Sequence, residues 1–277
     1  MKNNKYLKDL AQKNRLNIIK MFYKSKTGHM APALSCIDIL TALYFGGILE
    51  NDEWGNNDRD RVILSKGHAC AAIYSILAEK GCFSKEELMT FYQKNTMLQG
   101  HPRIGLAGIE TATGSLGHGI CFATGVAKAG KLDDKDYRVY AIIGDGEMQE
   151  GSVWEAALFA SANKLDNITV VLDNNKLQAS ARTADVLPLE SIQKKWESFG
   201  WQVIAVDGHD LEALVEAFEK VKNIKDMPSI IVASTIKGKG VSFAENNEAW
   251  HSRAPKDKEW EQLCTEMGIS VKNLEII

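Results

Sequence analysis

The stretch Val139-Tyr-Ala-Ile-Ile143-Gly144-Asp145-Gly146 decides the fold class of this chain. It is a short, almost continuous apolar run that ends in a carboxylate between two glycines. Runs of this kind are typical of parallel strands that are covered on both faces. Similar runs predict strands over residues 61–64, 139–143, 168–172, 202–206 and 229–233.

Helical patterns lie between these runs. Ser84 with Glu87, and Ser152 with Glu155, have the spacing of a capping box, so each pair predicts the start of a helix. Asp210 predicts the start of a further helix, which runs to about residue 223. Its apolar positions fall on one helical face: they are Leu214, Ala217, Phe218 and Val221.

The alternation of strands and helices predicts an α/β fold with a doubly wound, mostly parallel sheet and helices on both faces. No Pro-rich or Ser-rich linker divides the chain. We therefore expect one domain over residues 1–277, with residues 256–277 as a terminal helix and tail.

Composition excludes several classes of protein. The chain has 277 residues, 45% hydrophobic and 25% charged, which is ordinary for a globular protein and unlike a disordered or fibrous one. A net charge of −3 argues against a nucleic-acid partner. No apolar run approaches the roughly 18 residues of a membrane span, and the polar start lacks the apolar core of a signal peptide.

The cysteines are odd in number and scattered, without a CxxC pair. They predict reduced thiols in a cytoplasmic protein: Cys36, Cys70, Cys82, Cys121 and Cys264.

Ligands of such folds bind beyond the carboxyl ends of the strands. The segments that follow four of the predicted strands carry glycine, hydrogen-bonding groups or charge: Ser65–His68, Gly144–Gly146, Asp173–Leu177 and Ser234–Gly240. Glycines beside Asp145 allow a phosphate to approach the backbone amides. Asp145, the amide oxygen of Asn175 and a nearby backbone carbonyl form an all-oxygen set suited to Mg²⁺ or Ca²⁺, shared with ligand phosphates.

Each half of this pattern alone also fits an ordinary turn. Together, Gly144-Asp145-Gly146, 27 residues and then Asn174-Asn175 resemble the thiamine diphosphate fingerprint. The intervening Glu150-Gly151-Ser-Val-Trp-Glu155-Ala-Ala narrows the resemblance to transketolases, specifically their N-terminal, diphosphate-binding domain. Further matching motifs, within residues 5–260, are Thr27-Gly28-His29, Ser65-Lys66-Gly67-His68, Gly100-His101-Pro102, Thr113-Gly114-Ser115-Leu116-Gly117, Lys237-Gly238-Lys239-Gly240 and Trp250-His251-Ser-Arg-Ala-Pro255.

The resemblance implies thiamine diphosphate and a divalent metal as cofactors. The implied metal ligands are Asp145, Asn175 and the carbonyl of Leu177. Lys237 matches a lysine that neutralises the diphosphate, and Glu150 matches a glutamate at the subunit interface. The full set of implied cofactor-binding residues is His68, Gly114, Ser115, Leu116, Gly146, Glu150, Asn175, Lys237 and His251.

Histidine can donate or accept a proton near neutral pH. A lone histidine is usually a satisfied core or surface residue, but the resemblance implies that His29, His101 and His251 line the substrate channel as catalytic residues, and that His68 and His251 contact the diphosphate. His118 stands where the family usually has glutamine and receives no role. His209 is expected in a turn before a helix.

One stretch departs from the family pattern. Met30-Ala31-Pro32 replaces a small, glycine-rich run, and Pro32 cannot supply the hydroxyl that often lies near the diphosphate. Cofactor contacts in this stretch are therefore left open.

The resemblance covers only the first of three transketolase domains, and the glutamate that activates the cofactor lies in the second. We therefore expect a split transketolase: a transferase of carbohydrate metabolism, inactive alone, with a C-terminal partner subunit in an α2β2 heterotetramer. The expected reaction is reversible two-carbon transfer between sugar phosphates. Pentose phosphate, sulfosugar and branched-sugar donors stay open.

Other classes stay open as well. A 2-oxo acid dehydrogenase α subunit or a deoxyxylulose-phosphate synthase would share the cofactor fingerprint, although the histidine motifs favour ketose chemistry. A non-catalytic homologue is a third hypothesis, and the intact metal and histidine positions argue against it. A nicotinamide dehydrogenase is disfavoured because no GxGxxG follows a strand near the start.

Overall fold

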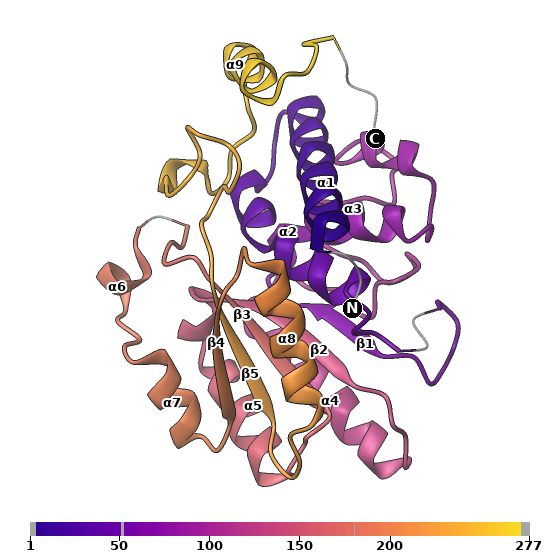
Figure 1. Ribbon diagram of the computed structural model, residues 1–277, viewed down its shortest axis with the longest axis vertical. Helices are drawn as coiled ribbons and strands as arrows, with labels where there is room; N and C mark the ends of the chain where they lie inside the picture. Colours follow the sequence, from indigo (N-terminus) through magenta and orange to yellow (C-terminus); the bar gives the residue numbers. More distant parts are fainter. Residues whose placement is uncertain (1–3, 51–52, 180, 273–277) are drawn as a thin grey trace.

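The computed structural model describes residues 4–50, 53–179 and 181–272. Its centre is a five-stranded parallel sheet with strand order β1-β2-β3-β5-β4 (Figure 1). The strands are β1 (Arg61–Leu64), β2 (Val139–Gly144), β3 (Ile168–Asn174), β4 (Gln202–Asp207) and β5 (Ser229–Ser234). All five predicted strands are confirmed, each beginning at the predicted residue and four extending one or two residues further.

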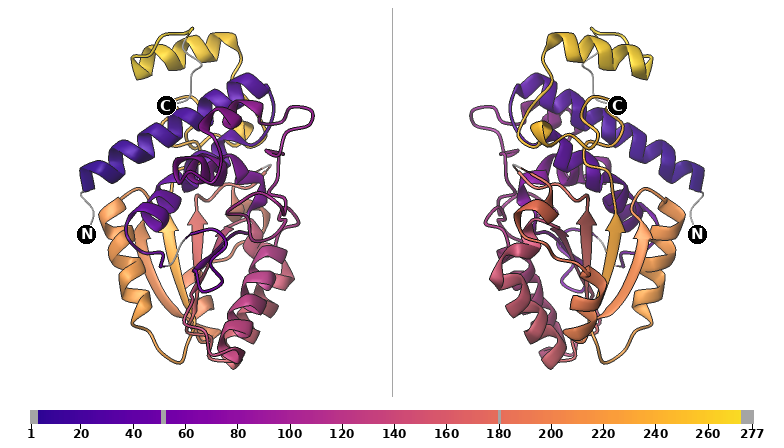
Figure 2. Two further views of the ribbon diagram at one scale, coloured as in Figure 1. Left: turned by 90° about the vertical axis from the view of Figure 1, so that its right-hand side faces the viewer. Right: turned by 90° about the vertical axis from the view of Figure 1, so that its left-hand side faces the viewer.

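Helices cover both faces of the sheet, as predicted. The α-helices are α1 (Asn4–Ser25), α2 (Met30–Phe45), α3 (Cys70–Glu79), α4 (His118–Leu132), α5 (Gly151–Ala162), α6 (Thr183–Val186), α7 (Ile192–Ser198), α8 (Leu211–Lys222) and α9 (Asp257–Met267). The 3-10 helices are η1 (Gly67–Ala69), η2 (Lys85–Thr90), η3 (Glu147–Gln149) and η4 (Glu248–Trp250). Figure 2 shows α1 crossing beyond the carboxyl ends of the strands, with α8 and α4 on opposite sides of the sheet.

Two apolar cores lie on the two faces of the sheet. One joins the sheet to α1, α2, α3 and α8, and the other joins it to α4, α5 and α7. Helix α2 is buried on nearly all sides, which explains why its sequence has hardly any amphipathic pattern. At the other end of the chain, Trp260 of α9 stacks on Tyr23 of α1 with ring centroids 4.4 Å apart.

The register of the sheet aligns the ends of its central strands. Gly144 pairs with Asp173, and Asp173 pairs with Ala233 of β5. The residues that directly follow these strands therefore emerge side by side at one edge. This alignment places the segments after β2, β3 and β5 around a common space.

The predictions of helix starts had different outcomes in the structure. Asp210 caps α8 as expected, since its carboxylate accepts from the amides of Glu212 and Ala213. The capping box predicted at Ser84 is wrong, because the Ser84 hydroxyl donates to the Glu86 carboxylate and the segment forms the 3-10 helix η2. The box predicted at Ser152 is also wrong.

Helix α5 begins one residue earlier than Ser152, at Gly151. Glu150 occupies its N-cap position without a side-chain capping bond. Ser152 therefore lies in the first turn of the helix, where its hydroxyl cannot act as the cap.

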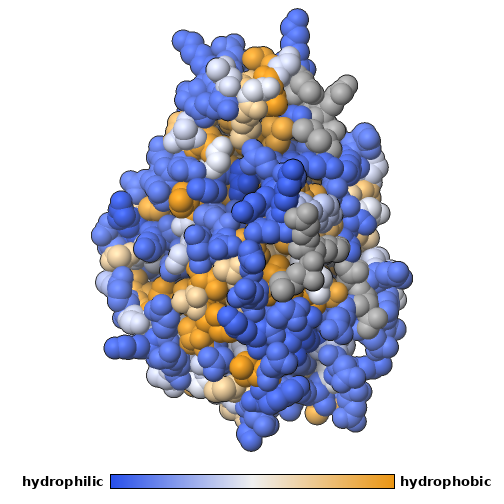
Figure 3. Space-filling view, viewed as in Figure 1, coloured by the Kyte–Doolittle hydropathy of each residue, from blue (hydrophilic) through white to orange (hydrophobic). Residues whose placement is uncertain are grey.

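Strand β4 also differs from the expectation that each strand is covered on both faces. It forms an edge of the sheet, and Ala205 is exposed while Ile204 and Val206 are half-buried. Figure 3 shows apolar side chains gathered over this strand, between α7 and α8. A continuous apolar run therefore does not distinguish a central strand from this edge strand.

Two further expectations concern the cysteines and membranes. All five cysteines lie in the described residues and are free thiols, as predicted. Across residues 4–50, 53–179 and 181–272, every helix is too short or too polar to cross a bilayer.

Candidate active site

A cavity of about 410 Å³ opens at the carboxyl edge of the sheet. Loops that follow β1, β2, β3 and β5 contribute to it, together with the start of α2 and the segment between η2 and α4. It is lined by His29, Pro32, Lys66, His68, His101, Gly114, Leu116, Gly144, Asp145, Gly146, Glu147, Gln149, Glu150, Asn175, Leu177, Gln178, Ala179, Lys237 and His251.

Four histidines from distant parts of the sequence meet in this cavity. The ring centroid of His29 lies 5.4 Å from that of His68, 6.2 Å from that of His101 and 5.4 Å from that of His251. His68 and His251 are 5.3 Å apart. The structure thus brings together all four histidines to which the sequence assigned a role.

Burial lowers the pKa of these imidazoles and so favours their neutral form. Burial, and then the positive charge of Lys237, lowers the pKa of His251 to about 3. Burial likewise lowers the pKa of His29 and His101, and that of His68 falls well below its usual value, with Lys66 as the next cause. Neutral imidazole offers one donor and one acceptor nitrogen, as proton transfer to and from hydroxyl groups requires.

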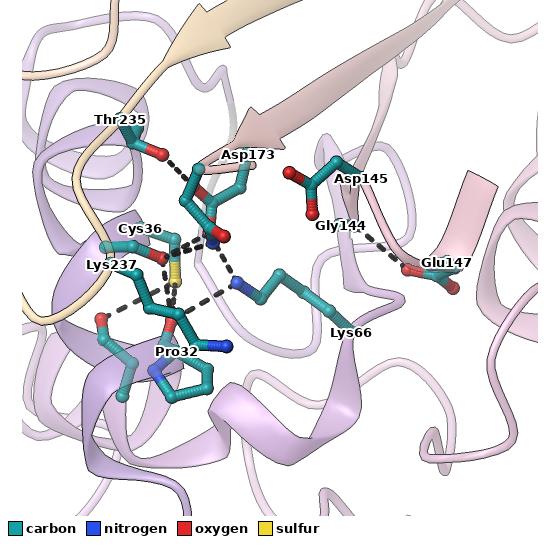
Figure 4. A network of polar contacts seen from close by, with 12 residues as sticks. Pro32, Cys36, Lys66, Gly144, Asp145, Glu147, Asp173, Thr235 and Lys237 are labelled. Carbon is teal, nitrogen blue, oxygen red and sulfur yellow. Dashed lines mark hydrogen bonds and ion pairs between the residues drawn. The ribbon is translucent and has the colours of Figure 1, made fainter. Parts of the chain in front are cut away.

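A buried ion pair lies beside the cavity, and its lysine is a lining residue. The ammonium of Lys66 contacts the carboxylate of Asp173, and both side chains are almost completely buried (Figure 4). Asp173 also accepts from the hydroxyls of Ser35 and Thr235. Although burial opposes ionisation, the Lys66 charge leaves the pKa of Asp173 below its usual value.

Lys237 lies on the same cavity in a different environment. Its ammonium donates to the carbonyls of Leu177 at 3.2 Å and Gln178 at 2.9 Å, and to Nδ1 of His251 at 2.7 Å. Burial, and then the charge of Lys66, lowers the pKa of Lys237 to about 8. Among the described residues this ammonium has no carboxylate in ion-pair contact.

The predicted oxygen set surrounds the turn after β3. The Asp145 carboxylate accepts from the amides of Gly146 and Lys176, and Oδ1 of Asn175 accepts from the amide of Leu177 at 3.0 Å. These bonds bring Asp145, Asn175 and Leu177 to one cavity. Burial, and then the Asp173 charge, raises the pKa of Asp145 to about 6, so this carboxylate favours a nearby cation.

Glu147 holds the loops around the cavity together. Its buried carboxylate accepts from the Ser65 hydroxyl, from the amide of Gly117 at 2.9 Å and from the amide of Gly144 at 3.1 Å. It thereby links the segments after β1 and β2 to the start of α4. The sequence assigned no role to Glu147, although a carboxylate directly after Gly144-Asp145-Gly146 was a visible signal.

Three further residues at or beside the cavity had no role predicted from the sequence: Lys66, Asp173 and Gln178. Lys66 stands inside a quoted motif, and Asp173 ends the apolar run of β3, but only the fold shows that the two side chains pair.

One predicted cofactor-binding residue, Ser115, lies outside the lining. Ser115 stands between the lining residues Gly114 and Leu116 and is itself exposed. His118, to which no role was assigned, begins α4 and is exposed. His209 lies in the turn before α8, as predicted. Pro32 lines the cavity and its carbonyl accepts from Lys66 at 3.2 Å.

Comparison with known proteins identifies the family to which this chain belongs. The family model described as "Transketolase, thiamine diphosphate binding domain" matches residues 7–277. The chain belongs to the transketolase family. It corresponds to the thiamine diphosphate-binding domain of that family.

Similar proteins include two that are named as separate subunits. The chain is 39% identical to a subunit of the apulose-4-phosphate transketolase of Phocaeicola vulgatus, over 96% of this chain and 95% of the relative. It is 41% identical to the 6-deoxy-6-sulfo-D-fructose transketolase subunit SqwG of a Clostridium species, over 88% and 90%.

Longer transketolases match over part of their length. Human transketolase is 39% identical over 96% of this chain but only 43% of the human protein. The crystal structure of Campylobacter jejuni transketolase superposes with a TM-score of 0.90 at 30% identity, covering 99% of this chain and 45% of that one. The chain thus spans less than half of these transketolases, and nearly all of the separate subunits.

The cavity fits the diphosphate of the transketolase cofactor. Lys237 offers a buried ammonium without a carboxylate partner among the described residues, and Nδ1 of His29 is buried there without a hydrogen-bond partner. Gly114 and Gly146 leave room that a side chain would fill. A Cβ at Gly114 would lie 2.7 Å from Cδ2 of His101, and one at Gly146 would lie 3.0 Å from Cβ of Gln178.

The donor set also fits a divalent metal shared with that diphosphate. In the described part of the chain, no group of three or more His, Cys, Asp or Glu side chains could hold a metal ion. A metal here would therefore depend on mixed oxygen ligands: one carboxylate, one amide and one carbonyl from the protein. Mg²⁺ is commonly bound in this way, with phosphate oxygens and water completing its shell.

Proposed function

We propose that this chain, together with a second subunit, catalyses the reversible transfer of a two-carbon ketol group from a ketose phosphate to an aldose phosphate. The observation that carries the proposal is the convergence of four neutral histidines and the Lys237 ammonium on one cavity. The histidines match the chemistry of sugar hydroxyls, and the ammonium matches a diphosphate.

Thiamine diphosphate supplies a nucleophilic carbon and an electron sink when it is bound. On this chain, Lys237, His68 and the amide of Gly146 would hold its diphosphate. Asp145, Asn175 and the carbonyl of Leu177 would hold Mg²⁺ or Ca²⁺. Gly114 and Leu116 would face its aminopyrimidine ring, with Ser115 beside them.

Three histidines would act on the substrate. Because the Lys237 ammonium donates to Nδ1 of His251, the hydrogen of this neutral imidazole is on Nε2, from where it can be donated to a sugar oxygen. Nδ1 of His29 has no partner in the described structure and is free to bind a hydroxyl. His101 lines the same cavity, with its ring centroid 6.2 Å from that of His29.

The second subunit would be a transketolase C-terminal chain in an α2β2 assembly. Two relatives that match over most of their length are named as subunits, which supports a split enzyme. Helices α4 and α5 expose large apolar side chains, which monomers seldom leave in numbers on neighbouring helices: Phe122, Leu158 and Phe159. Glu150, exposed at the start of α5, would lie at this subunit interface.

The specificity of the enzyme for its sugar substrate would be determined partly by residues outside this chain. The names of two relatives specify apulose-4-phosphate and 6-deoxy-6-sulfo-D-fructose, so both compounds belong in a substrate test beside pentose phosphates. The cavity on this chain offers no further cation than Lys66 and Lys237 among its described lining residues. Recognition of the distal phosphate or sulfonate would therefore come from the second subunit.

The test is reconstitution. The purified chain, its candidate C-terminal partner and the mixture of the two are each assayed with thiamine diphosphate, Mg²⁺ and a panel of ketose donors and aldose acceptors. We expect ketol transfer in the mixture alone. Normal turnover by this chain alone would overturn the split, and decarboxylation of 2-oxo acids instead of ketol transfer would overturn the reaction class.

A further inference from the structure

The segment that carries Lys237 is held by side chains from outside the cavity. The amide of Ile236 donates to Nε2 of His209 at 2.8 Å. The carbonyl of Lys239 accepts from Nε of Arg15 at 2.9 Å. Backbone groups on both sides of Lys237 are thus bound by side chains that come from α1 and from the turn before α8.

Asp38 of α2 joins these two side chains. Its Oδ2 accepts from Nη2 of Arg15 at 2.8 Å and from Nδ1 of His209 at 2.7 Å. Arg15 and Asp38 are each about 5–6% exposed, so their ion pair is shielded from solvent, while His209 is half-buried. We call Arg15, Asp38 and His209 the positioning network.

The bonds fix the form of the His209 ring. A backbone amide can only donate, so Nε2 of His209 must accept from Ile236 and carries no hydrogen. The hydrogen is therefore on Nδ1, where it is donated to Asp38. His209 is thus neutral in a single tautomer, with one nitrogen for the network and the other for the Lys237 segment.

The packing leaves this segment little freedom to adopt another path. A Cβ at Gly240 would lie 2.4 Å from Cδ of Arg15, and a Cβ at Gly208 would lie 2.4 Å from Cγ2 of Thr235. The amide of Gly238 donates to the carbonyl of Ala31 at 3.1 Å. The network therefore holds a loop that closely follows the surfaces around it.

We propose that Arg15, Asp38 and His209 form a positioning network that fixes the backbone around Lys237 and so pre-organises its ammonium for the diphosphate. His209 is the critical member, since it alone of the three binds the amide of Ile236, the residue before Lys237. The proposal rests on the proposed function, because the ligand of Lys237 there is thiamine diphosphate. Pre-organisation of this kind raises affinity by reducing the ordering that binding requires.

Two substitutions of His209 separate positioning from simple stability. In His209→Gln, a side-chain oxygen can reach the place of Nε2 and accept from Ile236. In His209→Asn, the shorter amide can still donate to Asp38 but cannot reach the Ile236 amide. The control is Asn167→Ala. Asn167 directly precedes β3, at the amino ends of the strands, and its buried side-chain amide donates a hydrogen bond to the carbonyl of Ala127, which the substitution removes.

The first measurement needs no cofactor. Amide hydrogen exchange on the full chain should show faster exchange at Ile236 in His209→Asn, and near wild-type exchange in His209→Gln and Asn167→Ala. Equal exchange at Ile236 in wild type and His209→Asn would overturn the proposal.

The second measurement is calorimetric binding of thiamine diphosphate with Mg²⁺ to the assembled two-subunit enzyme. Side chains that hold metal ligands in place are typically worth about 10–100-fold in metal affinity. Taking the same scale for the diphosphate site, we expect His209→Asn to bind thiamine diphosphate about tenfold more weakly than wild type, with His209→Gln restoring most of the loss. Asn167→Ala should lower the melting temperature without changing affinity.

Equal affinity in His209→Asn and wild type would overturn the positioning role. If the wild-type assembly binds no thiamine diphosphate, the proposed function fails instead, and hydrogen exchange still decides whether His209 orders the Lys237 segment.

Discussion

Two buried lysines reach the same cavity from the ends of different strands, and they differ in what surrounds them. Lys66, after β1, is paired with Asp173, and this pairing raises the pKa of Lys66 against the effect of burial. Lys237, after β5, contacts carbonyls and an imidazole, and burial lowers its pKa to about 8. Each residue is about 1% exposed.

The difference separates structure from binding. The charge of Lys66 is neutralised within the fold, so its loss should be felt first in stability. The charge of Lys237 has no carboxylate partner among the described residues, so its loss should be felt first in the affinity for an anion. Figure 4 shows the two side chains close together, so their location alone does not explain the contrast.

The largest expected effect is the loss of folding stability when the Lys66–Asp173 ion pair is broken. Asp173→Asn leaves the Lys66 ammonium buried without its counter-charge, which should reduce the free energy of unfolding by about 3–5 kcal/mol. Urea denaturation followed by circular dichroism measures this loss. Adding Lys66→Met should recover part of it, since the unpaired charge is then removed. A loss below about 1 kcal/mol in Asp173→Asn would show that the pair is not structural.

Lys237→Met should show the opposite pattern. We expect unfolding in urea to be unchanged or slightly harder, because a desolvated cation is removed. Calorimetry on the assembled enzyme should show about 10–100-fold weaker binding of thiamine diphosphate, the equivalent of about 1.5–3 kcal/mol for a charged hydrogen bond. Unchanged affinity would contradict the assignment of Lys237 to the diphosphate.

Low pH should reduce the stability of the fold around Lys237, because its partner His251 becomes protonated. The folded-state pKa of His251 is about 3, below the unfolded value of about 6.5, so the unfolded chain binds the extra proton first. The stabilisation is therefore complete above pH 6.5 and is lost as the pH falls toward 3. In His251→Asn, urea midpoints measured across this range should fall less steeply than in wild type. Parallel slopes would contradict the shift.

The smallest effect is expected from the carboxylate of Glu248, which tends to raise the pKa of Lys237 from a distance. Exposed charge pairs are worth about 0.2–1 kcal/mol. Glu248→Gln should therefore change thiamine diphosphate affinity less than about fivefold, in the same calorimetric assay. A tenfold or larger change would mean that Lys237 already has an effective counter-charge.

The fold was largely predictable from local pattern. Strands are continuous apolar runs in a parallel sheet, so their positions could be predicted within one or two residues. Helix α2 could not be assigned by periodicity, because packing on every side leaves no polar face to mark it. The capping-box predictions at Ser84 and Ser152 were wrong because a serine hydroxyl can form hydrogen bonds with several nearby groups. The spacing of residues in the sequence does not show which of these groups it bonds.

The site was predictable where it follows strand ends. Asp145 and Asn175 share an edge because the register of β2 and β3 is set by their apolar residues. The partnership of Lys66 with Asp173, and that of His209 with Asp38, join residues far apart in the chain. No periodicity or spacing encodes such contacts, so they required the three-dimensional structure.

The strand order has a consequence for how the chain folds. Leu64 of β1 pairs with Ile142 of β2, and four helical segments (η1, α3, η2 and α4) intervene between them. All four strand pairings of the sheet are parallel, so none can form as a local hairpin, and such topologies fold slowly. The cavity exists only after these distant segments have closed on one another. A cofactor that binds there cannot template early folding; it can only slow the unfolding of chains that are already native.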